Sequence, residues 1–445
     1  MSMARAMISE PSEPLSLNVP KPIVGNSNPL AAVNTSGISS HLVSWQSTSL
    51  TTLQSGETPA DAPPQSDTVQ RKWRALSRRR VSGNVGDVTL TSLHDDTRHS
   101  FASDNYAGIH PDVLAALATA NGGHQPPYGA DDYTRRLGDV VRDHFGDTAE
   151  VYPLFNGTGA NVVALSAVLP RWGAVIAPLS AHINTSEGAA PERLSGIKVI
   201  GVDTADGKLT PPQIEMEALA LGDEQLAQPL AVSITQVTEL GTLYTAVQIA
   251  ELCETAHRLG MAVHVDGSRL WNAAAALRQP FREFLTDVGV DIVSLGGTKN
   301  GTMAAEAVVV IDPTRAPGAG FLRKSTTQLS SKMRFTSAQL LALFDDDLGI
   351  RNATHSNAMA ARLRAALERG IADGALTGLA LSRRTESNTV FARLPNETAD
   401  RIREKVHFYD WDRGVGEVRW MTAWDTTADD VDRFVEAIRW GFAQR

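Results

Sequence analysis

From about residue 95 onward, short runs of β-branched residues alternate with longer Ala- and Leu-rich stretches that are apolar on one face, and this rhythm limits the fold most. It is typical of βαβ units, in which helices cover a mainly parallel sheet. We expect strands at Val175–Pro178, Lys198–Val202, Ala231–Thr235, Ala262–Val265, Ile292–Ser294 and Ala307–Ile311. We expect helices at Pro111–Thr119, Ala160–Val168, Ala246–Leu259 and Ala360–Glu368.

Composition divides the chain into three parts. Residues 1–90 are mostly rich in Ser, Thr, Pro and Asn and lack apolar periodicity, so we expect a disordered N-terminal extension that buries too little surface to offset its ordering entropy. Residues 95–340 should form a large α/β domain. Residues 341–445 should form a smaller α+β domain with strands at Thr389–Leu394 and Glu417–Met421.

Charge and cysteine content exclude several classes of protein. Asp and Glu number 50 against 41 Lys and Arg, a net charge of −9 that argues against a nucleic-acid-binding surface. The sequence has neither a membrane-spanning apolar run nor a secretion signal, so we expect a cytoplasmic protein. The single cysteine, Cys253, allows no internal disulfide and no thiolate metal cage, and we expect it to be buried on a helix.

A glycine-containing segment lies directly before the expected helix Ala160–Val168. It contains Gly157 and Thr158. Main-chain N–H groups at a helix N-terminus attract phosphate, and glycine lets the backbone approach a ligand closely. An ordinary helix entry with a Thr cap has the same pattern, so this segment alone leaves the two interpretations open.

Two further polar segments follow expected strands, at the edge where open α/β sheets bind ligands. Asp266 follows the strand Ala262–Val265, and Lys299 follows Ile292–Ser294 among glycines and a threonine. A desolvated lysine can form a Schiff base, and a carboxylate can hold a proton on a pyridine nitrogen. Taken singly, these residues could be a helix cap and a surface charge. Together with the phosphate-type segment, they indicate a pyridoxal 5'-phosphate (PLP) site.

The region from about Phe101 to Trp440 resembles the low-specificity L-threonine aldolases of the β-eliminating lyase group. The motifs that carry the resemblance are Ser103-Asp104-Asn105, Tyr128-Gly129, Gly157-Thr158, Ala181-His182 with Glu187, the string from Asp266 to Ala273, and Lys299. The resemblance implies a fold type I PLP-dependent large domain and a smaller C-terminal domain. It also implies a lyase that cleaves L-threonine or L-allo-threonine to glycine and acetaldehyde.

The resemblance further implies which residues bind the cofactor. Lys299 would form the Schiff base, Asp266 would face the pyridine nitrogen, and His182 would stack on the ring. His182, or a water that it holds, would also take the proton of the substrate hydroxyl. The remaining implied cofactor contacts are Gly157, Thr158 and Arg269, and no metal ion is implied.

Three other residues would contact the substrate or a neighbouring subunit. Ser103 and Arg419 match residues that bind the carboxylate of the amino-acid substrate, for which a guanidinium offers a bidentate fork. Tyr128 matches a tyrosine that reaches the cofactor of a neighbouring subunit. This implies a homodimer or homotetramer with shared active sites.

The sequence departs from the better-known members of the group in two places, and one is at the lysine, where they usually read Ser-Lys-Gly and this chain has Thr298-Lys299-Asn300-Gly301. Where they read Glu-Asn-Thr-His, this chain has Thr235-Gln236-Val237-Thr238, so a second active-site histidine is missing and the threo or allo preference stays open. Another PLP reaction, such as β-elimination or transamination, is the main alternative, since one fold hosts many reactions. A third hypothesis is a cofactor-binding scaffold whose basic segment, residues 71–80, recruits a partner.

Overall fold

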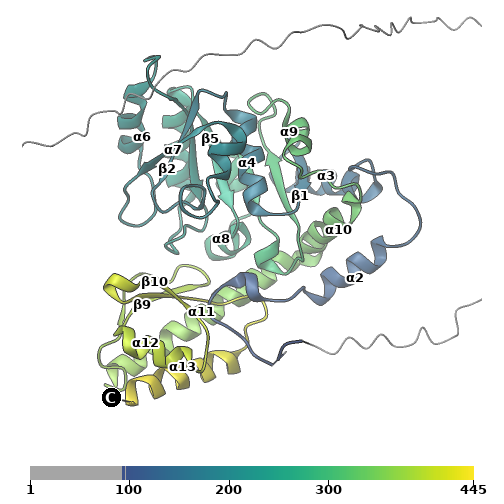
Figure 1. The fold of residues 1–445 in the computed structure, drawn as a ribbon. Coiled ribbons are helices and arrows are strands. Elements are labelled where there is room, and N and C mark those ends of the chain that lie inside the picture. Colours follow the sequence, from purple (N-terminus) through teal and green to yellow (C-terminus); the bar gives the residue numbers. More distant parts are fainter. Residues whose placement is uncertain (1–92, 96, 445) are drawn as a thin grey trace, which may run out of the picture. The chain divides into compact units, whose positions relative to one another are not determined.

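The computed structural model describes residues 93–95 and 97–444, and the predicted N-terminal extension lies outside them. Its larger sheet has seven strands in the order β1-β7-β6-β5-β4-β2-β3, and Figure 1 labels β1, β2 and β5 among them. The strands are β1 Glu150–Leu154, β2 Gly173–Pro178, β3 Lys198–Val202, β4 Gln228–Thr235, β5 Ala262–Gly267, β6 Ile292–Leu295 and β7 Glu306–Val310. Strand β7 runs antiparallel to β1 and β6, and the other pairings are parallel. The predicted mainly parallel sheet is therefore confirmed.

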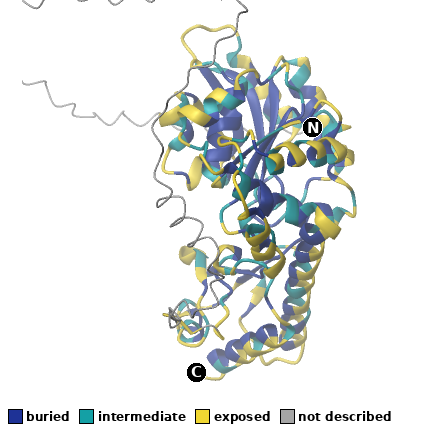
Figure 2. Cartoon of the chain, turned by 90° about the vertical axis from the view of Figure 1, so that its right-hand side faces the viewer, coloured by how far each residue is buried: buried dark blue, intermediate teal, exposed yellow. Residues whose placement is uncertain are grey.

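The strands in the middle of this sheet are apolar at nearly every position because both faces are covered. Every residue of β2, β5, β6 and β7 is buried, and Figure 2 shows these strands in dark blue between helices whose outer sides are exposed. The helices are α2 Pro111–Ala120, α3 Asp132–Phe145, α4 Gly157–Val168, α5 His182–Thr185, α6 Pro211–Glu217, α7 Ala246–Arg258, α8 Leu270–Leu277, α9 Ala319–Ser325, α10 Met333–Phe344, α11 Leu348–Ala372, α12 Asn396–Arg403 and α13 Ala428–Ala443.

Helix α7 illustrates how the local sequence sets these elements. Thr245 and Gln248 form a capping box, in which each side chain accepts the main-chain N–H of the other. One face of the helix packs into the core and carries Ile249, Cys253 and Ala256, at the three- and four-residue spacing of a helix face. Cys253 is buried as predicted, and burial raises the pKa of its thiol to about 12.

A second sheet is antiparallel and comes from the C-terminal part of the chain. Its strands, in the order β10-β11-β9-β8, are β8 Ala380–Leu381, β9 Thr389–Arg393, β10 Tyr409–Asp412 and β11 Glu417–Met421. On one face, Trp420 lies edge-on to Phe434 of α13, with ring centroids 5.3 Å apart. Successive side chains of a strand point to opposite faces, so Arg419 of β11 lies on the other face.

The stretch expected to separate two domains is helical on both sides of a short break. The 3-10 turn Asp345–Asp347 interrupts the chain between α10 and α11, and Asp346 and Asp347 have positive φ angles. Helix α11 packs against both α8 and α13. The predicted domain boundary between residues 340 and 341 stays a prediction.

No helix in the described part of the chain combines the length and apolar character needed to cross a membrane.

Candidate active site

Polar side chains meet in a cavity of about 230 Å³ at the C-terminal ends of β5 and β6 and the N-terminus of α4. Five residues predicted from the sequence are in its wall: Gly157, Thr158, His182, Asp266 and Lys299. The rest of the lining consists of Asn105, Phe155, Asn156, Asn161, Glu187, Ser268, Thr298, Met303, Ala304 and Glu306. The edge of the sheet that the sequence indicated is thus the place where these groups converge.

The N-terminus of α4 provides main-chain donors to this cavity. The Asn156 side chain caps the helix by accepting the N–H of Gly159 at 2.7 Å. The N–H groups of Gly157 and Thr158 belong to the first helical turn, which has no intrahelical acceptors. A Cβ atom placed on Gly157 would meet nothing within 4 Å, so the space beside it is open. This helix end can therefore hold a phosphate group.

A chain of hydrogen bonds connects Asp266, which is predicted to face the ring nitrogen, to His182, which is predicted to stack on the ring. The Asn161 amide donates to Asp266 Oδ2 at 3.0 Å and to Glu187 Oε1 at 2.8 Å. Glu187 Oε1 also lies 2.8 Å from His182 Nδ1. Asn161 Oδ1 and Glu187 Oε2 are buried without a partner in the described structure. The chain fixes the carboxylate and the imidazole relative to each other, and it leaves polar atoms available to a ligand.

Asp266 is held in its charged form. It is 4% exposed, and burial alone would raise its pKa. The charge of Lys299 and hydrogen bonds from Asn161 and Ser268 nevertheless place the pKa below the ordinary value. A buried carboxylate that stays ionised can stabilise a protonated nitrogen in a ligand.

Lys299 lies in the 3-10 turn Thr298–Asn300 directly after β6. Burial lowers the pKa of its ammonium, and the positive charge of Arg269 lowers it further. Three nearby carboxylates raise it, those of Asp104, Asp266 and Glu306. Because the balance lies below the ordinary value, the neutral amine, which is the nucleophile, forms more readily than on a surface lysine.

Arg269, whose side chain is 10% exposed, lies beside the cavity rather than in its wall. Its Nε and Nη2 donate to the two oxygens of Asp104 at 2.7 and 2.9 Å. Asn388 of the C-terminal region also donates to Asp104, at 3.1 Å. Asp104 therefore connects Arg269, which closely follows β5, to Asn388 of the C-terminal region. Both charges of the ion pair lie close enough to Lys299 to shift the pKa of its ammonium.

Arg419 is a cation without a carboxylate partner among the described residues. Its guanidinium lies 4.8 Å from the centroid of the Trp411 ring. Burial and the charge of Arg269 lower its pKa to about 10, so it remains cationic at neutral pH. A partly buried guanidinium that forms no ion pair with the described carboxylates is suited to bind an anionic ligand.

Ser103 and Tyr128 are outside the cavity wall. The Ser103 hydroxyl accepts the main-chain N–H of Asn105 at 3.1 Å and so fixes a turn whose Asn105 lines the cavity. Tyr128 is 51% exposed, and the ammonium of Lys324 lies 5.0 Å from its ring centroid. Within one chain, Tyr128 therefore has an accessible surface and is not part of the wall around Lys299.

Two buried carboxyl groups were not singled out from the sequence. Glu239 accepts the His182 main-chain N–H and the Thr235 hydroxyl, both at 2.9 Å, and burial raises its pKa. Glu306 is the first residue of β7 and lines the cavity. Glu306 directly precedes the apolar run of β7 and Glu239 lies four residues after β4, positions at which acidic residues are commonly exposed to solvent, so no signal in the sequence marked these two as functional.

The imidazole of His264 lies inside the sheet, two residues before Asp266. It is fully buried, with Nδ1 2.9 Å from Ser233 Oγ on β4 and Nε2 2.9 Å from Ser294 Oγ on β6. Burial lowers its pKa to about 4, whereas an unfolded histidine titrates near 6.5. Between these two values the unfolded chain binds more protons, so the free energy of unfolding falls as the pH falls.

We therefore expect acid to destabilise the wild type more than His264→Gln, which has no imidazole to protonate but can still bond to both serines. Between pH 6.5 and pH 4, the wild type should lose about 3 kcal/mol more than the variant. Urea unfolding at several pH values measures both losses. Equal losses in the two proteins would refute the prediction, whatever the stability of the variant at neutral pH.

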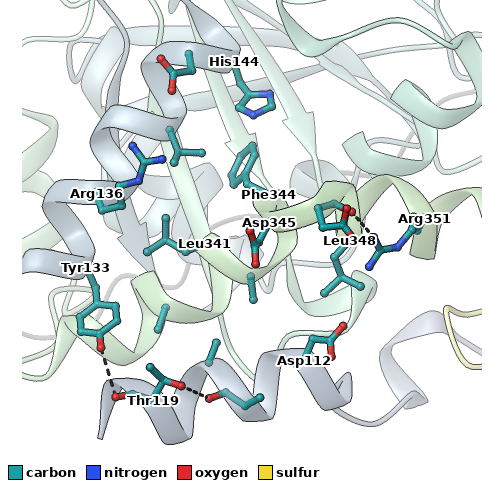
Figure 3. Close-up of a pocket in the computed structure, with 17 residues that line it drawn as sticks. Asp112, Thr119, Tyr133, Arg136, His144, Leu341, Phe344, Asp345, Leu348 and Arg351 are labelled. Atoms are coloured by element: carbon teal, nitrogen blue, oxygen red, sulfur yellow. Dashed lines mark hydrogen bonds and ion pairs between the residues drawn. The ribbon is translucent and has the colours of Figure 1, made fainter. Parts of the chain in front are cut away.

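A larger cavity, of about 740 Å³, lies between α2, α3 and α10 (Figure 3). Its polar lining includes Arg136, Asp112 and His144, and Arg351 at its edge pairs with Asp346. It contains none of the residues predicted for the site, and no lysine. Size alone does not make a reactive site, so the smaller cavity around Lys299 is the candidate active site. No cluster of His, Cys, Asp and Glu in the described part of the chain could hold a metal ion.

Comparison with known proteins identifies relatives over most of this region. The model of the family described as "Beta-eliminating lyase" matches residues 100–397. The low specificity L-threonine aldolase of Pseudomonas aeruginosa is 38% identical over 346 residues, 77% of this chain and 98% of that protein. The protein of the same name from a Pseudomonas sp. strain is 37% identical over the same shares.

Solved structures of other proteins also have folds similar to that of this chain. The threonine aldolase of Leishmania major has a TM-score of 0.71 at 29% identity, covering 77% of this chain and 98% of that chain. Mouse CSAD has a TM-score of 0.60 at 14% identity, covering 77% of this chain and 83% of that one, a likeness of fold alone.

Proposed function

This chain belongs to the β-eliminating lyase family, and on that premise we propose that it is a PLP-dependent aldolase that cleaves L-threonine and L-allo-threonine to glycine and acetaldehyde. The fold type I architecture and the resemblance to low-specificity L-threonine aldolases, both predicted from the sequence, are confirmed. The observation that carries the proposal is the convergence of Lys299, Asp266 and the N-terminus of α4 on one cavity.

The groups present in the cavity fit PLP. The N–H groups of Gly157 and Thr158 would hold the phosphate, Lys299 would bind the aldehyde, and Asp266 would face the ring nitrogen. When bound, PLP supplies an electron sink that stabilises the negative charge left on the substrate Cα after bond cleavage. The ionised state of Asp266 supports this assignment, because a protonated ring nitrogen needs a nearby negative charge.

His182 is our candidate for the residue that accepts the proton of the substrate hydroxyl. Its Nδ1 faces Glu187 Oε1, so a proton on Nδ1 would be donated to that carboxylate. Nε2 then carries the lone pair and can act as the base. Glu239 also holds His182 in position by accepting its main-chain N–H.

Arg419 would bind the substrate carboxylate, and this assignment predicts a change in KM. Arg419→Ala should lose a charge-assisted contact of about 1.5–3 kcal/mol and raise KM for L-threonine by roughly 10- to 150-fold. Steady-state kinetics on the purified variant measure the effect. Arg393→Gln is the matched control, because Arg393 is 54% exposed on the neighbouring strand β9 and pairs with Glu417. An unchanged KM in Arg419→Ala would remove Arg419 from the site.

We also propose that the active sites are shared in a homodimer or homotetramer. Tyr128 supports this assembly, because its ring is half exposed within one chain and is available to a neighbouring copy. Sedimentation of the PLP-loaded protein would give the number of chains, and a monomer with full activity would contradict the proposal.

The proposed reaction is tested by product analysis. Purified protein with PLP should release acetaldehyde and glycine from L-threonine and L-allo-threonine, and none from D-threonine. L-serine in parallel tests the alternative reaction, since pyruvate and ammonia from serine without acetaldehyde from threonine would favour β-elimination. A protein that binds the cofactor but turns over neither threonine nor serine would favour the hypothesis of a cofactor-binding scaffold.

A further inference from the structure

Asn161 joins two carboxylates that come from different parts of the chain. It belongs to α4, is 2% exposed and lines the cavity around Lys299. Its amide nitrogen donates to Asp266 Oδ2 at 3.0 Å and to Glu187 Oε1 at 2.8 Å. Asp266 lies near the end of β5, and Glu187 follows the short helix α5. One amide group therefore connects two elements that contribute to the cavity wall.

The orientation of this amide is set by the chemistry of its partners. A carboxylate oxygen accepts hydrogen bonds, and the amide nitrogen carries two hydrogens, one for each carboxylate. The reversed amide would point its own oxygen at two carboxylate oxygens. In the orientation that remains, Asn161 Oδ1 is buried without a partner among the described residues. A buried acceptor without a donor costs folding free energy, which indicates that the two bonds of the nitrogen matter more than those of the oxygen.

The same amide is connected to the imidazole of His182 through one oxygen atom. Glu187 Oε1, which accepts from Asn161, lies 2.8 Å from His182 Nδ1. Glu187 is 7% exposed, and its other oxygen is buried with no partner in the described structure. Among the described residues, these are the two side-chain contacts that hold Oε1. Without the Asn161 bond, the carboxylate is free to turn away from Nδ1.

Asp266 depends on Asn161 in the same way. One of its oxygens accepts the Ser268 N–H at 3.0 Å, and the other accepts from Asn161. Burial alone would raise the pKa of this carboxyl, and the Asn161 bond is one of the contacts that lower it. Loss of the amide would therefore release one oxygen of Asp266 and weaken the hold on its charged form.

We propose that Asn161 is a positioning residue that sets Asp266 and His182 together. One amide hydrogen holds Asp266, which would face the ring nitrogen. The other holds, through Glu187, the imidazole that would take the substrate proton. The amide thus keeps these two groups at a fixed separation before the cofactor binds, and groups held in advance lower the barrier of the reaction that follows. The inference rests on the proposed function, which assigns those roles to Asp266 and His182.

Asn161→Leu tests this role, because leucine has a similar size and cannot donate a hydrogen bond. We expect kcat for L-threonine cleavage to fall about 10- to 100-fold, as when a hydrogen bond that orients a metal ligand is removed. KM should change by less than about threefold, since Arg419 rather than Asn161 would bind the substrate carboxylate. The visible circular dichroism of the bound cofactor should also change, because it reports how the site holds the ring.

Asn272→Leu is the matched control for this variant. Asn272 is 4% exposed, and its amide nitrogen also makes two bonds, to Ser356 Oγ at 2.9 Å and to Asn357 Oδ1 at 3.0 Å. It does not line the cavity. The control should lose stability in urea and keep the wild-type kcat and dichroism. Asn161→Ala is a second variant, which should show the same loss of kcat as Asn161→Leu.

A double variant tests whether Asn161 acts through Glu187. Glu187→Ala removes the acceptor that connects Asn161 with His182. Adding Asn161→Leu to Glu187→Ala should therefore lower kcat by a smaller factor than Asn161→Leu does in the wild type. Equal factors would show that the two residues act independently, and would overturn the inference.

The other outcomes separate this inference from the proposed function. A wild-type kcat and dichroism in Asn161→Leu would overturn the inference, as would equal changes in Asn161→Leu and Asn272→Leu. If neither Asn161 variant folds while Asn272→Leu does, Asn161 is a structural brace and the inference is wrong. A wild type that binds no PLP, or that binds it and cleaves no threonine, would instead refute the proposed function.

Discussion

Lys299→Ala is expected to reduce threonine cleavage by at least about 10⁴-fold, because the variant lacks the amine that holds the cofactor and exchanges it with the substrate. The structure gives this lysine the setting that its chemistry requires. It follows β6, faces Asp266 across one cavity, and has an ammonium pKa lowered by burial and by Arg269. Acetaldehyde release from L-threonine, measured with saturating PLP, gives the effect.

The matched control for this variant is Lys208→Ala. Lys208 is a partly buried lysine whose ammonium bonds to the Leu243 carbonyl and lies near Asp206, away from the cavity wall. It should retain wild-type turnover. Cleavage at a comparable rate in Lys299→Ala would show that the reaction does not depend on this amine.

Asp266→Asn is expected to lower kcat by about 10²–10³-fold while the protein still folds. Asparagine has nearly the same shape and can still accept the Ser268 N–H, but it cannot provide the negative charge that favours a protonated ring nitrogen. The wild-type carboxylate supplies that charge throughout the neutral range, since its pKa lies below the ordinary value. The expected loss is in kcat rather than in KM, because the charge stabilises electron density that develops during bond cleavage.

Asp291→Asn separates this electrostatic effect from a general loss of buried charge. Asp291 is 3% exposed and accepts from His257 and the Val263 N–H, but it precedes β6 and so lies at the opposite end of the strands. The control should lose stability and keep kcat. If Asp266→Asn retained wild-type kcat, Asp266 would not be the group that faces the ring nitrogen.

Most of the larger sheet could be predicted because its strands are buried on both faces and read as continuous apolar runs. The strand β1 was missed since its sequence contains Pro153, which removes a ladder donor. The structure tolerates it because β1 is at the edge of the sheet. In the second sheet, β8 has two residues and β10 has four, too few to show a period. The predicted helix Ala360–Glu368 is the middle of the longer α11.

The position of the site could be predicted where chemistry follows a strand end, as at Asp266 and Lys299. The sequence could not indicate that Asp104, some 165 positions away, would take up Arg269, because this contact depends on tertiary packing. Glu306 was missed for a related reason. An acidic residue at the start of a strand is usually exposed to solvent. The pairing of β7 with β6 buries Glu306 in the wall of the cavity that Lys299 also lines. The roles of the individual site residues stay predictions.

Borohydride reduction of the PLP-loaded protein, followed by mass spectrometry of its peptides, tests the central claim most directly. Reduction makes the bond between the cofactor and the lysine that holds it permanent. We predict that the label is on the peptide that contains Lys299, in proportion to the cofactor bound, and that no other lysine carries a comparable share. A label on a different lysine, or a protein that binds PLP and yields no labelled peptide, would contradict the account.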